Sequence, residues 1–254
     1  MTAVASLAAL TSWMDDYLRI RELPDLDGAV NGLQVENSGN VTRIVAAVDA
    51  SLESIEVAGR VPGTLLLVHH GLFWDRLPQV TGRRYRRLRA ALASDVAVYS
   101  AHLPLDAHPE VGNNPILARI LGLEVSGPFG NYKGLDVGLH GVLERDRDQL
   151  AQELSVAVGQ PVRLIPGGPK QTKRVALITG GAGSSALEAA ARGCDTFITG
   201  EGAHHTWFDA MENGVNLLFA GHWSTEVFGV RALAERVSEK FGIPWEFHAQ
   251  PTGL

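Results

Sequence analysis

Short apolar runs alternate with amphipathic segments along most of the chain. The runs have the composition of buried strands, whereas the segments between them resemble amphipathic helices. A strand, a helix and another strand in this order favour a mainly parallel sheet with helices on its faces. In the first half the pattern predicts strands at 43–49, 64–68 and 96–100, and helices at 51–59, 85–93 and 114–121.

The pattern changes within residues 122–134, which are rich in glycine, and we expect a domain boundary there. Beyond it, strands are predicted at 137–143, 161–165, 175–179, 196–199, 216–220 and 245–248, and helices at 146–158, 184–192 and 226–241. The sequence therefore predicts an α/β protein of two interlinked α/β units with mainly parallel or mixed sheets. The first unit is expected to comprise 1–127 plus 227–254, and the second 128–226.

Composition narrows the class of protein. Of the 254 residues, 45% are hydrophobic and 20% are charged, which is typical of a soluble globular protein. The N-terminal residues lack the basic segment of a signal peptide, and Cys194 is the single cysteine, so we expect a cytoplasmic protein without a disulfide or a cysteine-based zinc site. No apolar stretch reaches the roughly 18 to 20 residues of a membrane helix. The net charge of −6 argues against a nucleic-acid partner.

Histidines and carboxylates follow three of the predicted strands. In open α/β sheets, ligands bind just beyond the carboxyl ends of the strands, so we expect these side chains to meet in one crevice between the two units. The groups are His69 with His70, His102 with Asp106, and His222 with Glu226.

Each group alone has a simpler interpretation. His102 fits a packed histidine and Asp106 a turn cap, and a histidine four residues before a glutamate is common by chance. Taken together, five or six nitrogen and oxygen ligands exceed the needs of one tetrahedral ion. Two bridged ions are the more economical hypothesis, and this ligand mixture suits iron, zinc or manganese.

The order and spacing of six sequence blocks resemble the NIF-three-like family (NGG-one-interacting factor three; domain of unknown function 34). Bacterial members of this family are named GTP cyclohydrolase I type 2 or its homologues. The resemblance extends nearly end to end and matches the compact form of the family, without the additional domain of some members. The blocks are Asn31–Glu36, Val68–Trp74, His102–Glu110, Gly112–Asn114, Phe197–Glu201 and Gly221–Glu226.

The resemblance implies two divalent metal ions per chain and a toroidal homohexamer with its metal sites facing an interior cavity. The metal ligands that it implies are His69, His70, Asp106, His222 and Glu226. His102 matches a histidine beside the site, and we expect His102 and Glu201 to transfer protons. Since His69 and His70 are adjacent, we expect each to bind a different ion.

The function that follows is metal-dependent hydrolysis of a small nucleotide-like or phosphoester substrate. The GTP cyclohydrolase reaction comes from the family name alone. The alternative is a non-enzymatic ring that stores or delivers metal or acts as a regulatory scaffold. A ring that binds nucleic acid through the arginines of Arg83–Arg89 is a third interpretation, which the acidic net charge opposes.

Four further features keep two interpretations each. His204 and His205 are either a second metal pair or surface residues, and Asn31 either contacts substrate or forms a turn with Gly32. The glycine-rich segment 180–185 either cradles phosphate or makes a tight turn from strand to helix. The arginine cluster is either a solvated helix face or a phosphate contact.

Overall fold

Contacts divide the protein into two compact units. The computed structural model describes residues 4–74 and 79–254. Unit 1 comprises the described part of Met1–Leu105 together with Gly229–Gln250, and unit 2 comprises Asp106–Phe228 and Pro251–Leu254. The sequence pattern places this division near residue 127. The contacts place it earlier because the helix after Gly112 packs into the core of unit 2.

Unit 1 is built on a five-stranded sheet with the strand order β13-β4-β5-β6-β2. Strands β13, β4, β5 and β6 are parallel, and β2 is antiparallel to β6 at the edge. A separate pair, β1 with β3, is antiparallel. The strands are β1 (Ala5–Ser6), β2 (Gly32–Val35), β3 (Asn40–Val41), β4 (Arg43–Asp49), β5 (Thr64–His70), β6 (Val96–Ser100) and β13 (Trp245–Phe247).

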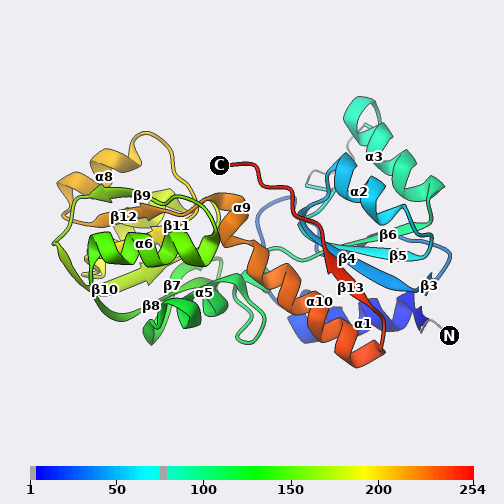
Figure 1. The fold of residues 1–254 in the computed structure, drawn as a ribbon, viewed down its shortest axis with the longest axis horizontal. Helices are drawn as coiled ribbons and strands as arrows, with labels where there is room; N and C mark the ends of the chain where they lie inside the picture. The colour runs from blue at the N-terminus through cyan, green and yellow to red at the C-terminus, as the bar shows by residue number, and fades with distance from the viewer. Residues whose placement is uncertain (1–3, 75–78) are drawn as a thin grey trace. The chain divides into compact units, whose positions relative to one another are not determined.

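Helices cover both faces of the unit 1 sheet, because its strands are apolar on both faces. Figure 1 shows α2 and α3 on one face and α1 and α10 on the other. The Ser51 hydroxyl caps α2 by accepting a hydrogen bond from the Ser54 N–H at 3.0 Å. The helices are α1 (Leu7–Leu18), α2 (Leu52–Ala58), α3 (Gly82–Ala93), α4 (Leu103–Asp106) and α10 (Val227–Phe241), of which α4 and α10 each include residues of both units.

Unit 2 contains a six-stranded mixed sheet with the order β7-β8-β10-β11-β12-β9. Strands β10, β11 and β12 are parallel, and the remaining pairings are antiparallel. The strands are β7 (Glu124–Tyr132), β8 (Leu135–Asp146), β9 (Arg163–Pro166), β10 (Gln171–Leu177), β11 (Thr196–Thr199) and β12 (Asn216–Phe219).

Strand β7 occupies most of the segment that the sequence suggested as a boundary. Its glycines have structural roles within a strand: the register shifts between Val125 and Gly127, and Gly130 has a positive φ of 70°. Glycine accommodates such irregular backbone without steric cost, but a glycine-rich segment of sequence is typical of a loop.

The core of unit 2 lies between its sheet and helices α5 and α6, where Leu117, Leu150 and Leu154 pack with Ile198. The helices are α5 (Asn113–Leu121), α6 (Arg147–Val158), a 3₁₀ turn η1 (Gly183–Ser185), α7 (Ala186–Ala191), α8 (Thr206–Glu212) and α9 (His222–Thr225). Among the described helices, none combines the length and the hydropathy needed to cross a bilayer.

We predict that Leu66→Ala lowers the free energy of unfolding of unit 1 by about 3 kcal/mol, because Leu66 is fully buried in the core between β5 and helices α2 and α3. The matched control is Leu92→Ala on α3, where the side chain is 66% exposed, and its effect stays within about 0.5 kcal/mol. Urea denaturation of both variants measures the difference. Equal effects would contradict this location of the core.

Candidate metal centre

Three histidines of unit 1 lie together at the carboxyl ends of two neighbouring strands. His69 and His70 end β5, and His102 follows β6, which pairs in parallel with β5. The ring centroid of His69 lies 4.8 Å from that of His70 and 4.9 Å from that of His102. One ring nitrogen from each lies within 4.8 Å of the other two, so these side chains could hold a metal ion.

Each of these imidazoles is hydrogen-bonded through Nδ1 to an oxygen that carries no proton. The acceptors are the Ala101 carbonyl for His69 (2.9 Å), Asp49 for His70 (2.9 Å) and Asp25 for His102 (2.7 Å). The proton in each bond therefore belongs to Nδ1, which leaves the lone pair of a neutral imidazole on Nε2. This is the arrangement by which proteins orient histidine ligands of metals.

Asp25 is a buried support of His102 that the sequence did not reveal. Its other oxygen accepts hydrogen bonds from the Leu103 N–H at 3.0 Å and from Asn31 Nδ2 at 2.8 Å. Burial raises the pKa of Asp25, but hydrogen bonds from His102 and Asn31 and the His102 charge outweigh burial and lower the pKa overall. Asp25 therefore remains an acceptor at neutral pH.

The two anchoring carboxylates differ in how well the sequence could have revealed them. Asp49 is the last residue of β4 and pairs in register with His70, so the strand-end argument applied to the histidines also covers it. Asp25 lies in an irregular segment before β2, where no periodic pattern indicates a role. Asn31 contacts this network directly, because its Oδ1 accepts a hydrogen bond from the His102 N–H at 2.8 Å.

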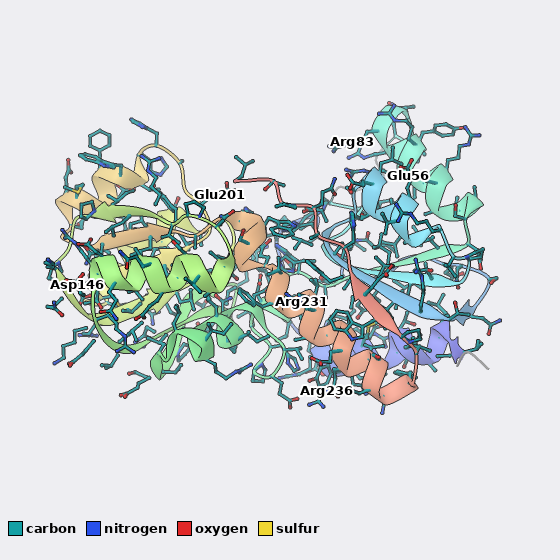
Figure 2. The ribbon with its side chains drawn as sticks, in the orientation of Figure 1. Glu56, Arg83, Asp146, Glu201, Arg231 and Arg236 are labelled. Atoms are coloured by element: carbon teal, nitrogen blue, oxygen red, sulfur yellow. The ribbon has the colours of Figure 1, made fainter. Side chains whose placement is uncertain are left out.

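Unit 2 brings together His222 and two glutamates. His222 Nδ1 is bonded to Glu201 Oε1 at 2.8 Å, and His222 Nε2 lies 3.2 Å from Glu226 Oε1. Figure 2 shows Glu201 beside the short helix α9 that begins with His222. Glu226 is 3% exposed, whereas the Glu201 side chain is about half exposed. His222 therefore also has an oxygen acceptor on Nδ1.

The two glutamates raise the basicity of His222. Burial lowers its pKa, but Glu226 first and Glu201 second stabilise the charged ring and raise the pKa to about 9. In the metal-free protein the imidazolium therefore bridges two carboxylates at neutral pH. If His222 held a metal ion through Nε2, the proton there would be released, so metal binding would be coupled to proton release.

Asp106 is held rigidly inside unit 2, where it is 4% exposed. Its Oδ1 accepts hydrogen bonds from Asn113 Nδ2 at 2.8 Å and from Thr179 Oγ1 at 3.3 Å. Asn114 fixes Thr179 in turn, since its Oδ1 accepts the Thr179 N–H at 2.8 Å. The two adjacent asparagines at the start of α5 thus position the carboxylate and the strand end that contacts it.

The glycine-rich segment after β10 lies against His222 and Glu226. Gly180 has φ of 72°, its N–H donates to Thr225 Oγ1 at 3.0 Å, and a Cβ there would meet Glu226 Oε1. Glycine is therefore needed for close approach to Glu226, which favours the tight-turn interpretation of 180–185. His204 and His205 are exposed, and the metal-binding groups found among the described residues do not include them.

Comparison with known proteins gives matches over nearly the whole chain. The family model Duf34/NIF3 (NGG1p interacting factor 3) matches residues 5–251. A protein of Deinococcus radiodurans named GTP cyclohydrolase 1 type 2 homolog is 45% identical over 247 residues, covering 96% of this chain and 93% of its own length. One of the same name from Pseudomonas aeruginosa is 39% identical over 250 residues, covering 94% of each chain.

Solved structures match equally well. Protein ybgI, described as of unknown function, has a TM-score of 0.92 at 35% identity and covers 98% of this chain and 100% of its own. TTHA1606 from Thermus thermophilus has a TM-score of 0.86 at 38% identity, with the same coverage. The fold is therefore shared along the entire length of these relatives.

The pKa of His222 predicts how the stability of the metal-free protein depends on pH. Because the pKa rises from 6.5 to about 9 on folding, the stabilisation is complete below pH 6.5 and is lost as pH rises through about 9. After allowance for the exposure of Glu201 we expect a loss on the order of 1–2 kcal/mol. Thermal denaturation in chelator from pH 6 to pH 10 measures it. His222→Gln should flatten this dependence, and an unchanged profile would contradict the contacts described.

We predict that Asp25→Asn weakens divalent metal binding about 10- to 100-fold, because the His102 Nδ1 proton loses its anionic acceptor. Competition with a chromophoric chelator measures the affinity. The control is Asp16→Asn, an exposed position of α1 in the same unit. Equal affinities for the two variants would show that Asp25 does not support a ligand.

Proposed function

The chain belongs to the Duf34/NIF3 family, and from its ligand sets we propose that it is a hydrolase that depends on two divalent metal ions. The observation that carries the proposal is shared by both units: four histidines are bonded through Nδ1 to an oxygen atom. Such bonds fix the orientation and raise the basicity of ligand imidazoles. The donor set of imidazoles and carboxylates fits iron, zinc or manganese.

For the ligands of the ions we retain the set that the family resemblance implies. The proposed ligands are His69 and His70 from unit 1 and Asp106, His222 and Glu226 from unit 2. His102 belongs geometrically to the unit 1 histidines, so its role beside the ions is either ligation or proton transfer.

The proposed reaction is hydrolysis of a small nucleotide-like or phosphoester substrate. Two bound ions would supply an activated water and polarise the bond to be cleaved. Proton transfer is the proposed role of Glu201, whose half-exposed carboxylate is accessible to solvent, and one of the two proposed roles of His102, whose Nδ1 proton is held by Asp25. The name of the relatives, GTP cyclohydrolase 1 type 2 homolog, supports a nucleotide substrate. The homohexamer and the cytoplasmic location stay predictions.

We predict two metal ions per chain after purification without chelator, measured by inductively coupled plasma mass spectrometry. His69→Gln should lose at least one ion, because its ring nitrogen is among those that could bind metal, whereas the exposed His204→Gln should keep both. The metal-loaded protein should hydrolyse at least one member of a nucleotide and phosphoester panel, and Asp106→Asn should abolish this activity.

The outcomes separate the alternatives. One ion or none in the unmodified protein would contradict the dinuclear centre. Two ions without turnover, combined with rapid transfer of metal to an apo-acceptor, would instead identify a protein that stores or delivers metal. Circular dichroism of each variant establishes that the loss of metal or activity is not caused by unfolding.

A further inference from the structure

Helix α3 is rich in arginine, and the proposed metal centre uses none of these residues. Its first eight residues, Gly82 to Arg89, include five arginines, and Figure 2 marks Arg83 among them. Arg83, Arg84 and Arg87 line a cavity of about 290 Å³ within unit 1, whereas Arg86 and Arg89 do not line it. The cavity is also lined by His70, so it adjoins the histidines described above.

The cavity wall carries an excess of positive charge. Asp49 is the one carboxylate among the described residues that line it, and Asp49 accepts the Nδ1 proton of His70. Within residues 4–74 and 79–254, neither Arg83 nor Arg87 forms an ion pair with a carboxylate. Burial and then the charge of Arg83 lower the pKa of Arg87, and the charge of Asp49 opposes them only in part.

The local backbone adds to this charge. Arg83 and Arg84 lie in the first turn of α3, where the helix dipole is positive and cations are unfavourable. No acidic residue lies in that turn, and the Thr81 side chain does not cap it. A bound anion offsets both unfavourable features, because exposed N–H groups and guanidinium groups favour the same ligand.

Arg87 supplies a further donor. Its Nε is buried and has no hydrogen-bond partner among the described residues. A buried donor left unsatisfied is costly, and the residue that carries it, Arg87, also lines the cavity. Phosphate offers several acceptor oxygens in the geometry that guanidinium groups match in pairs.

Apolar residues in the lining of the cavity indicate that the phosphate is part of a larger molecule. They are Leu72, Phe73, Trp74 and Leu88. Trp74 Nε1 donates a hydrogen bond to the Gly71 carbonyl at 3.0 Å. The Trp74 ring also makes an edge contact with the His102 ring, with the two ring centroids 4.9 Å apart. A cavity of about 290 Å³ is of a size to hold a small molecule, whereas a nucleic-acid strand needs a groove that several nucleotides can follow.

We propose that this cavity binds a small phosphorylated molecule, with the phosphate on Arg83, Arg84 and Arg87 and the organic part against Phe73 and Trp74. The binding itself goes beyond the proposed hydrolase function and does not need a metal ion. As an assignment of the substrate class for the neighbouring metal centre, it rests on that proposed function.

Isothermal titration of the full chain at constant ionic strength tests the site, with phenyl phosphate and inorganic phosphate as probes. Phenyl phosphate should bind more tightly, because inorganic phosphate lacks the apolar contacts. The double variant Arg83→Gln/Arg87→Gln should weaken phenyl phosphate binding at least about tenfold. The variant Arg83→Lys/Arg87→Lys keeps the charge but loses the paired hydrogen bonds. Its affinity for phenyl phosphate should lie between those of the unmodified protein and the glutamine variant.

The control is Arg86→Gln/Arg89→Gln, two substitutions of the same kind on the same helix but outside the cavity. Its affinity for phenyl phosphate should stay within about twofold of that of the unmodified protein. Equal weakening by the control pair would show attraction to net charge only and overturn the site. Equal affinity for both probes would overturn the assignment of an organic part to Phe73 and Trp74. Tighter binding of a single-stranded oligonucleotide that also needs Arg83 and Arg87 would replace the small molecule with nucleic acid.

Repeating the titration in chelator separates this inference from the proposed function. Arginine-dependent binding that persists without metal supports the site even if the chain proves not to be a hydrolase. Binding that appears only with metal, and that the arginine substitutions leave unchanged, would assign the phosphate to the ions and overturn the site. Metal content of the arginine variants should equal that of the unmodified protein, because no arginine is a proposed ligand.

Discussion

Parallel pairing of β4, β5 and β6 is the constraint on which the unit 1 site depends. The register places Asp49 beside His70 and Val68 beside Ser100, so the segments that leave these strands start from one edge of the sheet. The apolar interior of β5 is buried on both faces, which leaves its carboxyl end as the place where polar groups can serve a ligand. A shift of one residue would turn every side chain of a strand to the opposite face and separate the histidines from their acceptors.

Each unit contains at least one histidine whose Nδ1 proton is held by an oxygen acceptor, although the surrounding local structures differ. In unit 1, a backbone carbonyl and two carboxylates hold the Nδ1 protons, and in unit 2 Glu201 holds that of His222. Burying an imidazole that is bonded to an anion costs free energy unless every polar partner is hydrogen-bonded. Networks of this kind are therefore typical of functional sites. Three arginines of α3 and His70 line one cavity of unit 1, so the proposed phosphate site adjoins the unit 1 histidines.

Sequence reasoning predicted the α/β class and most of the strands, because buried strands leave an apolar pattern that survives without structural context. It missed β7, whose glycines permit a register shift and a positive φ but have the composition of a loop. The strand-end argument selected His69, His70 and His102, which lie together. Asp25 could not be predicted, since its role comes from an irregular loop that folds back onto His102 and leaves no periodic signal.

The central claim is that these histidines present Nε2 to metal because Nδ1 is already bonded to oxygen. Anomalous diffraction from crystals of the metal-loaded protein, recorded at the absorption edge of the bound metal, tests it most directly. The account predicts anomalous peaks about 2.0–2.2 Å from Nε2 of His69 and His70, with the Nδ1 bonds to Ala101 and Asp49 intact. Metal bound to Nδ1 after rotation of the rings, or no peak beside either histidine, would contradict it.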